Sequence, residues 1–181
     1  LAGLNTLWLN NTLITDTGLL HLQGLTTLQR LSVWNTKITD AGLVHLKGLN
    51  LKRLDIPKEC QTDLGLKHYL GAIEPPTELL LKDWQITDAG LEHLKGMNLT
   101  KLDVPKKAKT DIGLKHYLAA VQPSTHLSLS SWQITDAGLV HIKGLTNLQR
   151  LFLTNTRITD AALVHLAGLT ELQSLSLPPQ I

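Results

Sequence analysis

The chain has 181 residues, of which 43% are hydrophobic and 18% are charged, and its formal net charge is +2. This composition predicts one globular domain with a sizeable core, and the balance of 17 basic and 15 acidic residues gives no reason to expect nucleic acid or a membrane surface as partner. The single cysteine, Cys60, excludes an intrachain disulfide framework and a four-thiolate zinc site, and no apolar run is long enough for a membrane span.

The sequence repeats itself along its whole length. A Thr-Asp pair occurs seven times, with the aspartates at positions 16, 40, 63, 88, 111, 136 and 160, a mean spacing of 24 residues. Each pair lies in the frame L-x-x-L-x-L, a turn, and T-D-x-G-L-x-H, with Ala in place of Gly in the last repeat. A longer period is superimposed, because residues 41–88 and 89–136 align without a gap and share 31 identical positions. We interpret this as the duplication of a two-repeat cassette. Such regular periods predict a stacked repeat architecture.

In each repeat a short strand is predicted to precede a short helix. The alternating Leu-x-Leu pattern predicts strands that begin at Leu7, Leu31, Leu54, Leu79, Leu102, Leu127, Leu151 and Leu175. The spacing of Leu43 and Leu46 then indicates a helix stripe. Thr39 is expected to cap this helix, Asp40 to place negative charge at its start, and Gly48 to end it. Stacked at about 4.8 Å per strand, the eight strands predict one parallel sheet about 34 Å long.

Small residues recur at one position early in each helix, at Gly18, Gly42, Gly65, Gly90, Gly113, Gly138 and Ala162. Because glycine inside a helix costs about 1 kcal/mol relative to alanine, its recurrence predicts close backbone contact. At the amino end, residues 1–4 match residues 166–169, so the sequence is expected to start within a repeat. Residues 1–181 are therefore expected to be a single repeat domain and a fragment of a longer chain.

This frame resembles the leucine-rich repeat family, with its L-x-x-L-x-L-x-x-N/C-x-L core. It is most similar to bacterial repeats of the L-x-x-L-x-L-x-x-T-x-I-T-D-x-G-L type, which are related to the ribonuclease-inhibitor-like branch. The resemblance implies an α/β solenoid with a curved parallel sheet on its concave side and short α-helices on its convex side. It also implies that a protein ligand binds the concave face. The family's inward Asn or Cys is replaced here by Thr12, Thr36, Glu59, Trp84, Lys107, Trp132 and Thr156.

The residues of each strand that point away from the core predict the composition of the concave face. The residues predicted to contact a protein partner are Arg30, Trp34, Arg53, Asp55, Glu78, Lys82, Lys101, Asp103, Arg150 and Phe152. Trp and Arg are the residue types that most often dominate interface energies, and exposed aromatic side chains are expected near both ends of this face. The alternative interpretation is that these charges pair across neighbouring strands, with Glu78 between Arg53 and Lys101.

Two tryptophans of the cassette, Trp84 and Trp132, permit two interpretations. They lie 48 residues apart with Lys107 in the repeat between them, which suggests a Trp-Lys-Trp stack held by cation–π contacts. The alternative is that both rings pack at the edge of the sheet. The sequence alone leaves both open.

Seven histidines recur five residues after the aspartates, at His21, His45, His68, His93, His116, His141 and His165. Rings on adjacent helices are about 10 Å apart, too far to share a zinc ion, so we expect them to fill grooves between helices.

Catalysis is not expected. Asp55 and Asp103 are separated by Leu80 on a flat face, and Cys60 is replaced by Ala108 in the duplicate. The sequence therefore predicts a monomeric protein-recognition module without enzymatic activity or cofactor. The alternatives are a structural spacer within a larger protein and, third, a metal-responsive histidine row.

Overall fold

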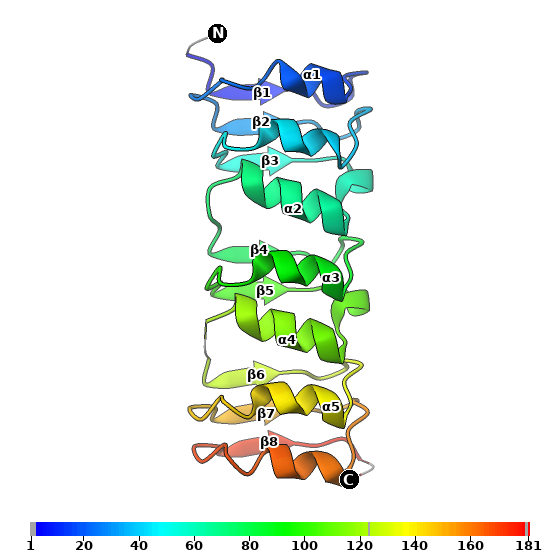
Figure 1. The fold of residues 1–181 in the computed structure, drawn as a ribbon, viewed down its shortest axis with the longest axis vertical. Coiled ribbons are helices and arrows are strands. Elements are labelled where there is room, and N and C mark those ends of the chain that lie inside the picture. The colour runs from blue at the N-terminus through cyan, green and yellow to red at the C-terminus, as the bar shows by residue number, and fades with distance from the viewer. Residues whose placement is uncertain (1–2, 123, 180) are drawn as a thin grey trace.

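The computed structural model describes residues 3–122, 124–179 and 181, and it stacks its repeats in chain order along one axis (Figure 1). The strands form one side of the stack and the helices the other, with the two termini at opposite ends (Figure 1). Leu1 and Ala2, which suggested a start within a repeat, lie outside the described residues. Within the described ranges, no helix is long and apolar enough to cross a membrane.

The eight predicted strands are present, and each has three residues and begins one position earlier than predicted. They are β1 (Thr6–Trp8), β2 (Arg30–Ser32), β3 (Arg53–Asp55), β4 (Glu78–Leu80), β5 (Lys101–Asp103), β6 (His126–Ser128), β7 (Arg150–Phe152) and β8 (Ser174–Ser176). Every paired strand is parallel, as predicted, and the central leucines of neighbouring strands are register partners. This pairing is the local reason for the L-x-x-L-x-L frame.

The sheet is not continuous, contrary to the prediction of one eight-stranded sheet. It divides into β1-β2-β3, β4-β5 and β6-β7-β8, with breaks between β3 and β4 and between β5 and β6. Each break follows one of the two ten-residue helices of the duplicated cassette. Packed helices lie about 8–10 Å apart, whereas paired strands lie about 4.8 Å apart. Where a repeat carries a full α-helix, the strands separate and the stack stays aligned (Figure 1).

The helices are shorter and more varied than the predicted uniform set. The α-helices are α1 (Asp16–Leu20), α2 (Asp63–Ala72), α3 (Asp88–Leu91), α4 (Asp111–Ala120) and α5 (Asp136–Leu139). The 3₁₀ helices are η1 (Gly42–Leu46), η2 (Lys58–Cys60), η3 (Glu92–Leu94), η4 (Lys106–Ala108), η5 (Val140–Ile142) and η6 (Asp160–His165). The predicted leucine stripe is confirmed, since Leu43 and Leu46 are fully buried. The predicted stop at Gly48 is consistent with its φ of 81°.

The Thr-Asp pairs connect neighbouring repeats. Asp16 accepts hydrogen bonds from the Thr39 amide and hydroxyl of the next repeat, each at 2.8 Å. The prediction that Thr39 caps its own helix is wrong, because η1 has no side-chain cap hydrogen bond. The same arrangement joins all six successive pairs, although Thr62 and Thr110 donate only through their hydroxyls. We call this row the Thr–Asp ladder. It satisfies polar groups at six successive interfaces between repeats.

The early-helix glycines are explained by close contacts. A Cβ atom at Gly65 would overlap the carbonyl oxygen of Cys60, and one at Gly90 would overlap the ladder carboxylate of Asp63. The predicted close backbone contact is therefore confirmed at Gly65, whereas at Gly90 the close neighbour is a side chain of the preceding repeat.

The inward turn position is occupied differently from the prediction in the two cassette repeats with long helices. Thr12, Thr36 and Thr156 each donate a hydroxyl hydrogen bond of 2.7 Å to the carbonyl of the preceding strand segment. The 3₁₀ turns η2 and η4 instead bury Cys60 and Ala108, so the placement of Glu59 and Lys107 inside was wrong and both are exposed. The tight turn shifts the inward position by one residue.

Candidate protein-binding face

The outward residues of the three sheets form the strand face. On the first sheet, the side chains of Trp8 and Trp34 are 61% and 47% exposed. Arg30 and Arg53 are neighbours in register on β2 and β3, and both are exposed. Large aromatic rings next to two guanidinium groups form the part of this face that is best suited to be buried by a partner.

The ion pair found on the described part of the strand face lies within one strand, not across neighbouring strands as the alternative interpretation has it. The Arg53 Nε lies 3.2 Å from both carboxylate oxygens of Asp55, two residues along the same strand. Glu78 lies opposite Lys101 in the β4–β5 pair, but the first sheet break separates Glu78 from Arg53. No ion pair other than Arg53–Asp55 is found among the described residues. The alternative interpretation, in which the charges pair from Arg53 through Glu78 to Lys101, is therefore interrupted at the first sheet break.

The second and third sheets contribute the remaining predicted residues. Lys82 is exposed beyond β4, and Asp103 on β5 is half-buried. Arg150 is exposed on β7, whereas Phe152, which was predicted as an exposed aromatic, is half-buried. The two sheet breaks therefore distribute the ten predicted residues over three separate patches.

Not every outward strand position reaches solvent. Ser32 is only 1% exposed, although its place in β2 predicts that it faces away from the core. Its hydroxyl oxygen is buried and has no hydrogen-bond partner among the described residues. Neighbouring atoms therefore cover the strand face at Ser32, and this side chain is not accessible to solvent.

A pocket of about 580 Å³ opens beside Trp34 at the end of the first sheet. Its walls include Ile56, Lys58, Glu59 and Asp83. Trp34 therefore borders a hollow whose walls carry charged groups of both signs. The sequence indicated Trp34 but not this hollow, because the hollow depends on the 3₁₀ turn at η2.

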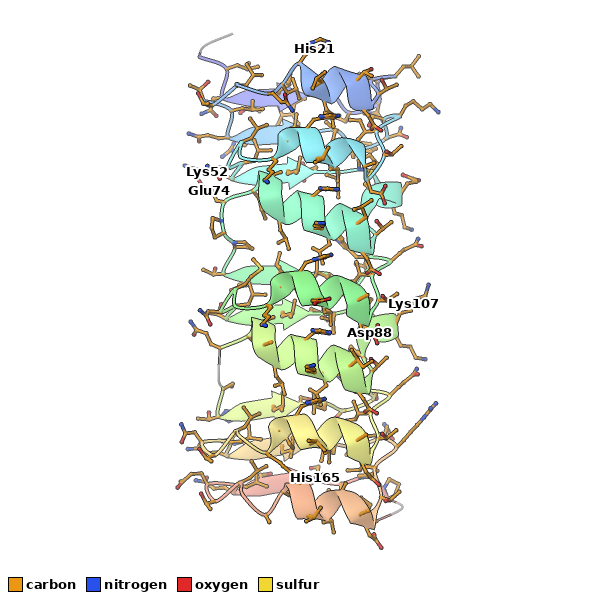
Figure 2. All side chains as sticks on the ribbon, in the orientation of Figure 1. His21, Lys52, Glu74, Asp88, Lys107 and His165 are labelled. Carbon is orange, nitrogen blue, oxygen red and sulfur yellow. The ribbon has the colours of Figure 1, made fainter. Side chains whose placement is uncertain are left out.

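The two cassette tryptophans pack against tyrosines. Tyr69 of α2 meets Trp84 edge to face with ring centroids 5.3 Å apart, and Tyr117 of α4 meets Trp132 in the same way at 5.4 Å. Trp132 is only 5% exposed, and Lys107 points outward (Figure 2). The packing interpretation is confirmed and the Trp-Lys-Trp stack is wrong.

The tyrosines were missed by the sequence reasoning. Each crosses from its helix to the strands at a sheet break, where it lines a crevice. Burial raises the pKa of the Tyr69 hydroxyl, and the nearby Asp55 carboxylate raises this pKa further. Tyr69 and Tyr117 lie 48 residues apart, as Trp84 and Trp132 do, and this shared period was the feature of the sequence that could have indicated the pairing.

The single cysteine, Cys60, lies in the core, away from the strand face. The Cys60 thiol is buried and its hydrogen bond goes to the Ile38 carbonyl at 3.3 Å. Burial, followed by the charges of Asp40 and Asp16, raises the pKa of this thiol to about 12. A thiol in this environment is protonated and unreactive at neutral pH.

The histidine row runs along the helix side, with His21 and His165 near its two ends (Figure 2). Burial, followed by the charge of Lys67, lowers the pKa of His68. The described part of the chain contains no group of three or more His, Cys, Asp or Glu side chains that could hold a metal ion.

Comparisons with known proteins agree with this architecture. No protein-family model matches the chain, and no curated protein does either. A chain from the octameric complex of latrophilin 3, Unc5D and FLRT2 (LRR) matches with a TM-score of 0.51 at 17% identity, covering 100% of this chain and 77% of that one. The internalin inlF from Listeria monocytogenes str. 4b F2365 matches at 26% identity with a TM-score of 0.43, covering 96% of this chain and 48% of that one.

TLR13 in its complex with ssRNA13 matches at 18% identity with a TM-score of 0.49, covering 98% of this chain and 33% of that one. The chain therefore spans about half of the internalin chain and a third of TLR13. Parallel three-residue strands in leucine register, backed by short helices with a period of about 24 residues, are the defining features of one architecture. The fold of this chain is that of a leucine-rich repeat solenoid.

Proposed function

We propose that this solenoid is a protein-recognition module that binds a protein ligand on its strand face. The observation that carries the proposal is the exposure of Trp8 and Trp34 on the first sheet beside Arg30 and Arg53. Large apolar side chains on a solvent face are costly to expose as a patch, and a partner that covers them gains most from aromatic and arginine contacts.

The contact residues proposed are the ten identified from the sequence, with the centre moved to the first sheet. Trp34 and Arg30 lie at this centre. The ion pair with Asp55 holds the side chain of Arg53 on the same face. The remaining members are Glu78, Lys82, Lys101, Asp103, Arg150 and Phe152. The mixed signs of these charges favour a protein over a nucleic acid, for which a uniformly basic surface is typical.

The proposal includes the finer features implied by the repeats. These are membership of the bacterial T-D-x-G-L type of the leucine-rich repeat family, a single domain over residues 1–181, a monomeric state and the absence of catalysis. The FLRT2-containing complex named above, which includes a leucine-rich repeat protein among other proteins, is consistent with a binding role for this architecture. Because fold alone does not determine function, the proposal depends on the strand face itself.

The test is affinity capture of partners from a lysate of the source organism. The bait would be compared with a Trp34→Thr variant, which places there the residue that the chain already has at the equivalent Thr154. A Val140→Glu variant serves as the control, because Val140 is 44% exposed on the helix side, away from the strand face, and its duplicate is Glu92. We expect one protein to be retained by the wild type and the control and lost by the Trp34 variant. Equal retention by all three would refute the strand-face assignment, and absence of any specific partner would favour the spacer function.

A further inference from the structure

Two equivalent crevices open at the two sheet breaks. The crevice between β5 and β6 has a volume of about 250 Å³, and its walls include Leu102, Tyr117 and Val121. Its counterpart between β3 and β4, 48 residues earlier in the duplicated cassette, has a volume of about 360 Å³ and includes Tyr69 and Ile73. Both crevices therefore have an aromatic and aliphatic floor where two strands fail to meet.

The break next to β5 leaves main-chain groups without the partner that pairing provides. At paired strands, the amide that follows a strand donates to the next strand, as Leu81 does to the Asp103 carbonyl and Leu129 to the Phe152 carbonyl, each at 2.8 Å. The equivalent amide of Val104 donates to no described residue, although Val104 is buried.

The acceptor at the start of β5 is in the same situation. The Thr77 carbonyl accepts the Thr100 amide at 2.8 Å across the β4–β5 pair. The carbonyl of Thr100 itself, which lines the crevice, accepts no hydrogen bond from β6 or from any other described residue. The amide of His126 bonds instead to the Ser124 hydroxyl at 3.1 Å. An unpaired strand edge is a template for an added strand.

The side chains at the rim distinguish the two crevices. Lys101, Gln122, Ser124 and His126 line the β5–β6 crevice, which has no carboxylate among its lining residues. Lys101 forms no ion pair among the described residues. This rim is therefore basic and its charge is available.

The β3–β4 crevice carries the opposite charge. Lys52 is accompanied there by Glu74 and Glu78, and Figure 2 shows Lys52 and Glu74 at the same edge of the stack. Pro76 also lines it where the duplicate residue is Ser124, and proline has no amide hydrogen to offer to a ligand. An acidic ligand is favoured by the β5–β6 crevice and repelled by its counterpart.

We propose that the crevice between β5 and β6 binds a short, extended and acidic segment of another polypeptide, which adds to the edge of β5 as a strand. Its main chain bonds to the Thr100 carbonyl and the Val104 amide, alternate apolar side chains lie against Tyr117 and Val121, and a carboxylate faces Lys101. This site goes beyond the proposed strand-face function, because it lies between strands and would exist whether or not the strand face binds a partner.

The probe is an acetylated, amidated eight-residue peptide of alternating valine and aspartate with a fluorescent label. Fluorescence anisotropy and calorimetry on the whole chain are expected to show saturable binding with one site. Hydrogen exchange of the Val104 amide is expected to slow in the complex. Absence of saturable binding up to about 1 mM peptide, a limit below which even weak recognition would be seen, would overturn the proposal.

The duplicated cassette supplies matched variants. The triple change Gln122→Glu, Ser124→Pro and His126→Glu gives the β5–β6 crevice the residues found at these positions in the β3–β4 crevice. It is expected to weaken peptide binding at least about tenfold by like-charge repulsion. The reverse change, Glu74→Gln, Pro76→Ser and Glu78→His, is expected to raise the stoichiometry from one peptide to two. Unchanged affinity in the first variant, with circular dichroism showing a folded chain, would overturn the assignment to this crevice.

A second probe separates strand addition from simple recognition of an apolar acid. The same peptide with alternate amides N-methylated keeps its side chains but loses its main-chain donors, and we expect at least about tenfold weaker binding. Equal affinity of the methylated peptide, or displacement of the peptide by octanoate at equal concentration, would refute strand addition. Because the first triple variant leaves Trp34 intact, its retention of the strand-face partner keeps the two proposals distinguishable.

Discussion

The Thr–Asp ladder leads to the most specific stability prediction, for the change Asp63→Ala. Asp63 accepts two hydrogen bonds from Thr87, one from its amide and one from its hydroxyl, each 2.8 Å long and partly buried. A hydrogen bond to a charged group contributes about 1.5–3 kcal/mol, and an amide left unsatisfied has a further cost. Because the Thr87 hydroxyl can turn to solvent, we expect a loss of about 2–4 kcal/mol in the free energy of unfolding.

The matched control is Asp160→Ala. Asp160 occupies the same position at the start of η6, but it receives no ladder hydrogen bond among the described residues. Its removal is expected to cost only the interaction of a carboxylate with a helix start, about 0.3–1 kcal/mol. Asp63→Asn keeps one acceptor oxygen, and its loss in the free energy of unfolding is expected to lie between those of Asp63→Ala and Asp160→Ala.

The assay is urea unfolding followed by circular dichroism. The stability of a repeat stack depends on the coupling between neighbouring units. A weaker dependence of the unfolding free energy on urea concentration in the Asp63→Ala variant would therefore indicate that the repeats before and after this interface unfold separately. If Asp63→Ala costs no more than Asp160→Ala, the ladder does not stabilise the interfaces, and the role assigned here to the Thr-Asp pairs is wrong.

Three further predictions concern single residues. Gly65→Ala is expected to destabilise the fold by about 1–3 kcal/mol through overlap with the Cys60 carbonyl, while Gly71→Ala in the same helix, where the nearest atom is 3.7 Å away, is expected to stabilise it by about 0.5–1 kcal/mol; thermal unfolding that shows equal effects would contradict this. The Cys60 thiol, with its pKa raised to about 12, is expected to react with Ellman's reagent at pH 8 only after denaturation, and rapid reaction of the folded chain would show that it is accessible. The Thr159 hydroxyl and amide lower the pKa of Asp136, so the stability from this contact is complete above the ordinary pKa of 3.8 and is lost as the pH falls through the lower folded value. Asp136→Asn is therefore expected to reduce the fall in melting temperature on acidification, and an unchanged acid dependence would contradict that assignment.

The parts of the fold set by local periodicity were predictable from the sequence. The Leu-x-Leu triplets located all eight strands, because a one-residue slip would turn a leucine from the core to solvent. The helix leucines and the small residues at the Gly65 position followed from the same logic, since both depend on contacts repeated in every unit.

The sheet breaks depend on interactions between repeats that no single repeat encodes. The separation of β3 from β4 reflects the length of α2 and the path of Tyr69 toward the strands, and neither is visible in the leucine pattern. The exposed position of Glu59 follows from a 3₁₀ turn that starts after Pro57. Pro57, directly before this turn, was the feature of the sequence that indicated the turn.

The candidate site was only partly predictable for the same reason. Exposed Trp34 was identified from its strand position, whereas the half-burial of Phe152 and the closure around Ser32 depend on neighbouring side chains. The pairing of Arg53 with Asp55 rather than with Glu78 follows directly from the first sheet break.

The most direct test of strand-face recognition is photo-crosslinking from defined positions. Benzoylphenylalanine would replace Trp34 on the strand face in one variant and Val140, which is 44% exposed on the helix side, in another. With the captured partner, we expect a crosslinked product from position 34 and none from position 140. A product from position 140 alone would place the partner on the helix side and contradict the account.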